Sequence, residues 1–191
     1  METTTSKKED ILQAALLLFA KRGFDATTIP MIAKEASVGA GTIYRYFENK
    51  DTLVNELFRF YVERYIIVLK EEYALREGTI RQRFHHLFHG MVRFSSENEH
   101  ALYFIKTHSH SHVLSQESKN TFEELIQLIR EFIEQGQVQG IIRQLPVNAL
   151  IAIVLGAFME LHQLVRVGDI EYSSDLLEGV ESSCWDAIRA Q

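Results

Sequence analysis

Residues 28–50 constrain the fold of this chain more than any other stretch, because they fit two short helices joined by a tight turn. In the first helix, Ile32, Ala33 and Ala36 are spaced by one, three and four residues, which places them on one helical face. The small side chain of Ala33 allows a second helix to cross closely, and Thr28 can cap the N-terminus. This pattern predicts a helix-turn-helix.

The second helix of the motif is predicted from Gly39 to Phe47, after Val38 in the turn. Ile43 and Phe47 lie four residues apart and are expected to face inward. The other side chains face outward, where small residues permit close approach of the backbone and polar residues donate hydrogen bonds. These outward residues are Ala40, Gly41, Thr42, Tyr44, Arg45 and Tyr46. Residues 28–47 are therefore a predicted DNA-binding motif.

The expected DNA contacts divide by position along the motif. Donors within the second helix are expected to contact base edges, namely Thr42, Tyr44 and Arg45. Donors at the edges of the motif are expected to contact phosphates, namely Thr28, Tyr46 and Lys50. The small residues at the start of the second helix are expected to lie close to the groove, namely Gly39, Ala40 and Gly41.

Four runs follow one another in and after the motif: Ile32–Ala36, Gly41–Phe47, Asn49–Asp51 and Leu53. In this order they resemble the N-terminal DNA-binding domain of the TetR family of bacterial transcriptional regulators. The resemblance implies a three-helix domain that contains the helix-turn-helix, over residues 5–65. It also implies a second domain over residues 66–191 that is helical, binds a ligand and forms the dimer.

Two positions depart from the usual pattern of that family. Ser37 stands in the turn where glycine is common, and a left-handed backbone there costs about 1 kcal/mol for a residue with a Cβ. Pro30 and Met31 replace a polar first turn, which proline tolerates because the first amides of a helix have no partner within it.

Composition favours an all-α fold of about nine helices. The chain has two prolines and no alternating runs of β-branched residues, so strands are not expected. A first helix is predicted to end near Arg22, before Gly23, and a long helix to run from about Lys50 to Glu77. Later helices are predicted over residues 79–95, 98–110, 116–137, 146–167 and 173–190.

Charge is distributed unevenly along the chain. Residues 1–50 hold seven Lys or Arg against six Asp or Glu, whereas residues 51–191 hold thirteen against twenty. An acidic second part disfavours nucleic-acid binding by the whole chain, so DNA contacts are expected in the first domain alone.

Two observations favour a cytoplasmic protein that does not enter a membrane. Cys184 is the single cysteine, which excludes an internal disulfide and suits a reducing compartment. The longest unbroken apolar run, residues 149–159, is shorter than the roughly 20 residues that a membrane-spanning helix needs.

The helix over residues 146–167 is apolar nearly all round, so it is expected to be covered on two sides. Together with the last helix it resembles the four-helix dimer interface of the family. The alternative is an ordinary core helix with no partner, which would leave a large apolar patch exposed. The residues expected at the interface are Ala152, Leu155, Gly156, Phe158, Leu177 and Val180.

Aromatic residues are frequent in the middle of the second domain. The family resemblance implies that a small effector binds among these helices, and apolar lining with few polar groups suits a lipophilic molecule. The residues expected to line this pocket are Phe88, Tyr103, Phe104, His108, Phe122, Phe158 and His162. A core without a pocket is the alternative. No cofactor is expected.

Alternating histidines at His108, His110 and His112 raise the question of a metal site. On a helix the first and third share a face and the second points away, and no cysteine or carboxylate pair completes a tetrahedral set. Exposed or hydrogen-bonded histidines, histidines that line the pocket and metal ligands all remain open, and no metal site is predicted.

These features predict a homodimeric transcriptional regulator that binds a two-fold symmetric site in double-stranded DNA. We expect a repressor that leaves its operator when a small lipophilic effector binds. One alternative is a helix-turn-helix regulator controlled by a protein partner or a metal. Another is an enzyme with a helical bundle, which is disfavoured because no catalytic motif is present.

Overall fold

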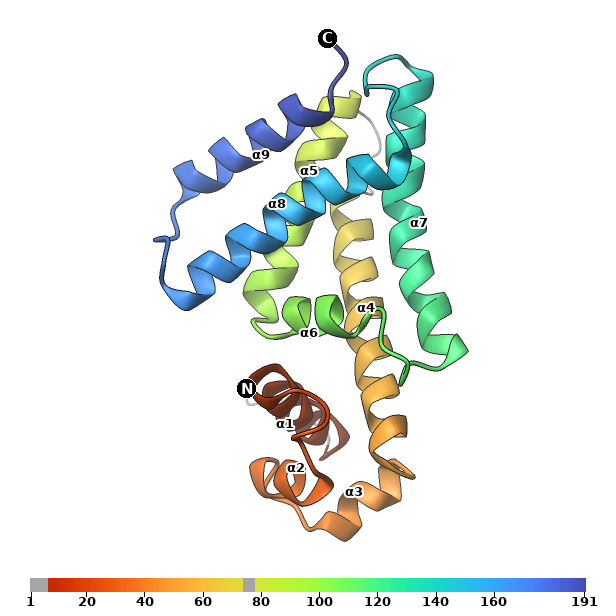
Figure 1. Ribbon diagram of the computed structural model, residues 1–191, viewed down its shortest axis with the longest axis vertical. Helices are drawn as coiled ribbons and strands as arrows, with labels where there is room; N and C mark the ends of the chain where they lie inside the picture. Colours follow the sequence, from red (N-terminus) through yellow and green to blue (C-terminus); the bar gives the residue numbers. More distant parts are fainter. Residues whose placement is uncertain (1–6, 74–77) are drawn as a thin grey trace. The chain divides into compact units, whose positions relative to one another are not determined.

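This computed structural model describes residues 7–73 and 78–191, and within these residues it has helices and no β-strands (Figure 1). In chain order these are α1 (Lys7–Arg22), α2 (Ile29–Glu35), α3 (Ala40–Tyr46), α4 (Lys50–Tyr73), α5 (Ile80–Glu97), α6 (Ala101–His108), α7 (Gln116–Val138), α8 (Val147–Val167) and α9 (Ser174–Ile188). The prediction of an all-α fold with about nine helices is confirmed.

Local chemistry fixes several of the helix ends. Gly23 and Gly168 follow α1 and α8 with φ values of 76° and 84°, which glycine adopts without strain. Ser173 caps α9, because its hydroxyl accepts a hydrogen bond of 3.1 Å from the amide of Leu176. The predicted helix 98–110 is shorter than expected, since only Ala101–His108 is helical. The end of the predicted long helix, residues 74–77, lies outside the described residues.

The described residues form two compact units. Unit 1 comprises the described parts of Met1–Glu63 and Asn98–Phe122, and unit 2 comprises those of Arg64–Glu97 and Glu123–Gln191. The helix-turn-helix thus shares a unit with α6, which lies far from it in the sequence. The division between residues 65 and 66 stays a prediction, and its residues 5 and 6 lie outside the described part of the chain.

The core of unit 1 surrounds Phe19 of α1. Its ring stacks on the ring of Phe104 in α6, with centroids 6.1 Å apart, and Phe104 in turn meets the edge of Phe58 in α4 at 6.3 Å. All three side chains are almost completely buried. Aromatic packing therefore joins α1, α4 and α6.

His108 belongs to this core. Its side chain is buried, its ring centroid lies 4.3 Å from that of Phe104, and its Nδ1 lies 3.0 Å from the carbonyl oxygen of Phe104. Burial lowers the pKa of His108 below its usual value, although the carbonyl contact opposes this in part. His110 and His112 are exposed. Of the three alternatives left open for His108, the structure favours a hydrogen-bonded core histidine.

The core of unit 2 includes Phe84, Phe88 and Phe158, and an ion pair joins α5 to α9. Arg81 donates two hydrogen bonds of 2.5 and 2.7 Å to the carboxylate of Glu181, whose side chain is only 5% exposed. This bidentate pairing satisfies a buried carboxylate, and Nδ1 of His85 lies a further 3.5 Å from the same carboxylate.

Helix α8 is longer than the apolar run that the sequence analysis considered. It has 21 residues, and the most apolar 18-residue stretch within it has a mean hydropathy of 1.7. By length and composition alone, α8 could cross a membrane. The apolar run is part of this longer helix, which continues past Glu160 to Val167. A single helix of this kind is weak evidence for a membrane span, because core helices of water-soluble proteins meet the same requirement.

The state of His108 generates a prediction about pH. The pKa of His108 in the folded protein lies below the value of about 6.5 in the unfolded chain, so between these two pKa values unfolding takes up a proton. The neutral, buried histidine therefore stabilises the fold above pH 6.5, and this stability is lost as the pH falls through the folded-state pKa. Wild type should therefore lose stability as the pH falls below about 6.5, and His108→Phe should lose less, by about 1.4 kcal/mol for each unit of pKa difference.

Urea unfolding at several pH values measures this dependence. His110→Phe is the control, because His110 is exposed and should leave the pH dependence unchanged. Equal pH dependence in wild type and His108→Phe would contradict a neutral, buried His108.

Candidate nucleic-acid interface

Helices α2 and α3 have the geometry predicted for a helix-turn-helix. Thr28 precedes α2 in an extended conformation, but its hydroxyl makes no capping hydrogen bond, so the side-chain cap expected from the sequence is absent. In the turn, the amide of Val38 donates to the carbonyl of Ala33 at 2.9 Å. Ser37 has a φ of 53° and is the one non-glycine residue with positive φ among the described residues. The expected left-handed strain at Ser37 is therefore present.

The inner face of the motif is buried as predicted. Ile32 and Ile43 have no exposed surface, Ala33 is 4% exposed and Phe47 is 1% exposed. Because these side chains fill the space between α2, α3 and the rest of unit 1, the opposite face of α3 is left to solvent.

The outer face of α3 carries the hydrogen-bond donors. Tyr44 and Tyr46 are 56% and 44% exposed, Arg45 is also exposed, and Thr42 is half-buried. Gly41 is exposed, and a Cβ added there would meet no atom within 4 Å. Packing within the chain therefore does not require this glycine, and the absent side chain leaves room for an external surface. Gly39 is equally open and Ala40 is half-buried.

Lys50 is placed differently from the expectation. Its Nζ donates hydrogen bonds of 2.8 Å to the carbonyl of Phe24 and 3.1 Å to that of Thr27, and it lies 3.9 Å from the centroid of the Phe24 ring. An ammonium group with two carbonyl acceptors and an aromatic face is already well solvated by the protein. We therefore correct its role: Lys50 joins α4 to the loop between α1 and α2, and does not point freely toward a phosphate.

The residues expected to line the ligand pocket are divided between the two units. Phe88 lines a cavity of about 30 Å³ in unit 2, whereas Phe158 and His162 line a separate one of about 170 Å³ in the same unit. The remaining four belong to unit 1, where the rings of Phe104 and His108 are buried: Tyr103, Phe104, His108 and Phe122. Phe104 and His108 are therefore core residues of unit 1, and their place in a ligand pocket stays a prediction.

The smaller cavity has a lining of apolar side chains alone. They are Leu69, Phe84, Leu87, Phe88, Met91, Ile129, Phe132, Ile133, Ile151, Val154, Leu155 and Ile188. Sequence reasoning missed nearly all of them, because it selected aromatic residues and most of the lining is aliphatic. The periodic apolar positions of α5, α7 and α8 were the available signal.

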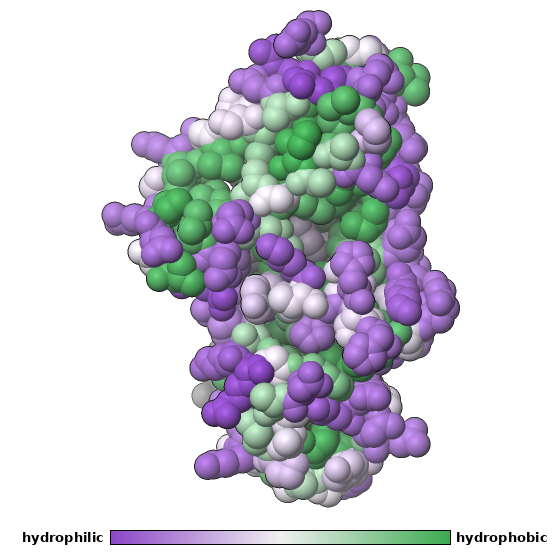
Figure 2. All heavy atoms as spheres, in the orientation of Figure 1, coloured by the Kyte–Doolittle hydropathy of each residue, from purple (hydrophilic) through white to green (hydrophobic). Residues whose placement is uncertain are grey.

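The expected dimer face is partly exposed. Ala152 and Gly156 of α8 are exposed, and a Cβ added at Gly156 would meet no atom within 4 Å. Leu155, Leu177 and Val180 are half-buried. Phe158 is 2% exposed and its ring lies 5.5 Å from that of Phe88, so its assignment to the interface is wrong. Figure 2 shows apolar residues gathered where Figure 1 draws α8 and α9.

No group of three histidine, cysteine, aspartate or glutamate residues within the described ranges is arranged to hold a metal ion. His108 is buried with its Nδ1 against a carbonyl, whereas His110 and His112 are exposed. The alternating histidines are therefore not gathered around a common point.

Two family models match this chain and together cover nearly all of it. The model for bacterial regulatory proteins of the tetR family matches residues 11–57. The model for the C-terminal domain of tetracyclin repressor-like proteins matches residues 58–190.

Individual relatives agree with these matches. An uncharacterised HTH-type transcriptional regulator of Haemophilus influenzae is 25% identical over 98% of both chains. The HTH-type transcriptional repressor KstR2 of Mycolicibacterium smegmatis is 36% identical over 30% of this chain and 28% of its own length. The crystal structure of a TetR family transcription regulator from Marinobacter aquaeolei has a TM-score of 0.82 at 24% identity, over 97% of this chain and 96% of the other.

The contacts of Lys50 generate a prediction that separates an internal role from a phosphate contact. Lys50→Met keeps the length of the side chain and removes the charged donor, so the two carbonyls lose their partner. We expect the free energy of unfolding to fall by about 1–2 kcal/mol, allowing for partial exposure of the group. The salt dependence of DNA binding should stay the same.

Urea unfolding and DNA titrations at several salt concentrations test this. Lys34→Met is the control for stability, because Lys34 is exposed on α2. A salt slope reduced by about one unit, with unchanged stability, would restore the phosphate contact.

Proposed function

This chain belongs to the TetR family of helix-turn-helix transcriptional regulators, and on that premise we propose that it is a dimeric repressor released from its operator by a small lipophilic molecule. The family consists of transcription regulators and not of enzymes. The observation that carries the proposal is the outer face of α3, with exposed phenols and a guanidinium around an open Gly41.

The exposed hydrogen-bond donors are proposed to make two kinds of contact with DNA, to base edges and to phosphates. Thr42, Tyr44 and Arg45 lie within α3 and are proposed to contact base edges in the major groove. Thr28 precedes α2 with a hydroxyl that makes no capping bond, and Tyr46 ends α3. Both are proposed to contact phosphates, which orient the protein without reading sequence.

Two copies of α3 are needed to read a two-fold symmetric operator. Adjacent major-groove half-sites lie about 34–36 Å apart, so a dimer must hold its recognition helices at that spacing. The uncovered face of α8, with Ala152 and Gly156 at its centre, supports α8 and α9 as the dimer surface. A pair of such faces removes apolar area from water on both subunits.

The smaller cavity of unit 2, which Phe88 and Leu155 help to line, supports a lipophilic effector, because its described lining offers no charged or polar side chain. Its volume of about 30 Å³ requires the walls to move when a ligand enters. Repression is proposed by analogy with the transcriptional repressor KstR2 of Mycolicibacterium smegmatis. A protein that acts on chromosomal DNA is proposed to work in the cytoplasm.

Selection of duplexes from a random pool by the purified protein tests DNA recognition. Arg45→Ala should relax preference at one base-pair position in each half-site by about 1–3 kcal/mol, because a guanidinium can bond two acceptors of one base. Arg130→Ala in α7 is the control and should leave the selected sequence unchanged. Retention of the full wild-type preference in Arg45→Ala would contradict base contact by this residue.

The dimer surface is tested by Gly156→Glu. The position is open in the protomer and glutamate favours helix over glycine, so the protomer should fold while the buried charge prevents association. Sedimentation should show monomers, and operator affinity should fall at least tenfold. Asn148→Glu adds the same charge at an exposed position in the first turn of α8 and should leave a dimer. A Gly156→Glu dimer of wild-type affinity would remove this face from consideration.

A further inference from the structure

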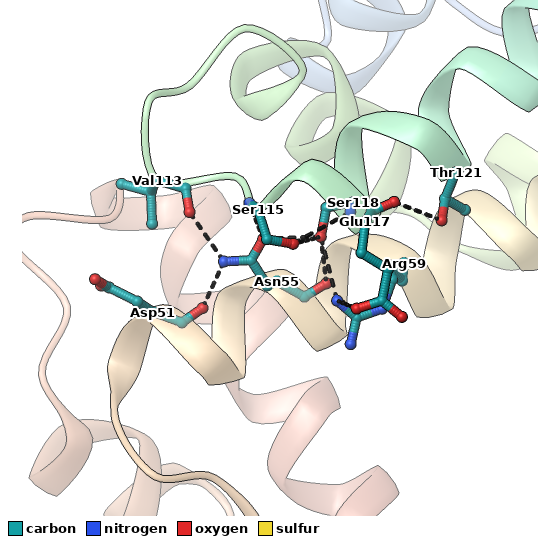
Figure 3. A network of polar contacts seen from close by, with 8 residues as sticks. All are labelled: Asp51, Asn55, Arg59, Val113, Ser115, Glu117, Ser118 and Thr121. Carbon is teal, nitrogen blue, oxygen red and sulfur yellow. Dashed lines mark hydrogen bonds and ion pairs between the residues drawn. The ribbon is translucent and has the colours of Figure 1, made fainter.

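Asn55 is a buried amide on α4 with every hydrogen-bonding position occupied (Figure 3). Its Nδ2 donates to the carbonyl oxygens of Asp51 at 2.8 Å and Val113 at 2.9 Å. Its Oδ1 accepts from the amide of Ser115 at 2.7 Å and from the hydroxyl of Ser118 at 2.8 Å. Since an asparagine side chain has two donor hydrogens and one doubly accepting oxygen, no capacity is left over.

Three of these bonds reach the segment that begins α7. Ser115 is the cap of that helix, because its hydroxyl accepts from the amide of Ser118 at 3.2 Å and its carbonyl accepts from that of Lys119 at 3.0 Å. Ser118 has no exposed surface. Asn55 on α4 therefore determines where α7 begins, and loss of the amide would leave buried donors and acceptors unpaired.

Further contacts enclose this polar group. Arg59, one turn after Asn55, lies with its Nη1 3.1 Å from the carboxylate of Glu117 and 3.3 Å from the hydroxyl of Ser118. On the apolar side, the ring of Phe58 lies 6.0 Å from that of Phe122. The start of α7 is thus held to α4 by both polar and aromatic contacts within unit 1.

The same stretch of α4 is held to the helix-turn-helix. Lys50, five residues before Asn55, bonds the carbonyls of Phe24 and Thr27 immediately before α2. A continuous series of hydrogen bonds therefore runs from Ser118 through Asn55 and α4 to the loop that positions α2. Packed and hydrogen-bonded series of this kind can transmit a displacement from one end to the other.

We propose that Asn55 is a positioning residue for DNA binding, which fastens the corner between α6 and α7 to the first turns of α4 so that this corner moves with the recognition helix. The inference rests on the proposed DNA-binding function. It assigns residues 109–122 to the part of the protein that responds to operator, although their sequence position is more than 60 residues after α3.

The test compares three variants. Asn55→Leu keeps the number and branching of the side-chain heavy atoms, strengthens the helix propensity of α4 and removes all four hydrogen bonds. Ser118→Ala removes one of them. Thr121→Ala is the matched control, because the Thr121 hydroxyl bonds only the carbonyl of Glu117 within α7 at 3.1 Å. Hydrogen exchange is measured by mass spectrometry with and without a duplex selected by the wild-type protein.

Without DNA, peptides from residues 109–122 should exchange at least tenfold faster in Asn55→Leu, and peptides from α8 should be unchanged. With DNA, wild type and Thr121→Ala should show exchange of residues 109–122 slowed at least fivefold. Asn55→Leu should show no such slowing and an operator affinity about tenfold weaker. If Asn55 only stabilised the start of α7, Asn55→Leu would speed exchange without DNA, but the slowing of exchange by DNA would remain.

Asn55→Leu with wild-type operator affinity, or wild-type protein whose residues 109–122 do not respond to DNA, would overturn the proposal. If peptides from α8 also exchange rapidly in Asn55→Leu, the variant is unfolded and Ser118→Ala decides by the same two measurements. A wild-type protein that selects no duplex would overturn the proposed function itself, while the exchange difference without DNA still tests whether Asn55 fastens the corner.

Discussion

The contact between the Lys50 ammonium and two backbone carbonyls is the interaction on which the arrangement of unit 1 depends. Helices α2 and α3 have seven residues each, and helices of that length are marginal without packing, since about 12–15 residues are needed for an isolated helix to persist. Their position is therefore set by what surrounds them. Lys50 holds the loop before α2 to the start of α4, and Ile32, Ile43 and Phe47 fill the space between. The exposed face of α3 is a consequence of these inward contacts.

The parts of this structure that sequence predicts are those determined by neighbours along the chain. Helix periodicity identified the buried face of the motif, because Ile32 and Ala33 or Ile43 and Phe47 share a face whatever else the chain does. The role of Lys50 could not be predicted in the same way. Its acceptors are backbone carbonyls 23 and 26 residues away, and every residue carries such a carbonyl. The buried position of Asn55 had only a weak signal in the sequence, because it is a polar residue next to Val54 and close to Leu57, both fully buried.

The residues predicted for the pocket belong to two different cores, for a physical reason of the same kind. Phe104 and His108 are aromatic and lie near the middle of the chain, and their rings pack on Phe19 of α1 within unit 1. The chemistry of a side chain indicates that the residue is buried in a core, but it does not indicate in which of two cores the residue lies. Because segment 98–122 returns to unit 1 between two segments of unit 2, residues adjacent in sequence there serve different cores.

Helix α8 brings the effector proposal and the dimer proposal onto one element. Ile151, Val154 and Leu155 line the small apolar cavity, while Ala152 and Gly156, each one residue further on and so about 100° round the helix, are exposed. Protein interiors are packed too closely to absorb a ligand in about 30 Å³ without displacement of the lining. A helix is stiff along its length, so displacement of Leu155 also displaces Gly156 and the face on which it lies. A ligand that enlarges this cavity would therefore change the surface proposed to set the separation of two recognition helices, without needing any contact with DNA.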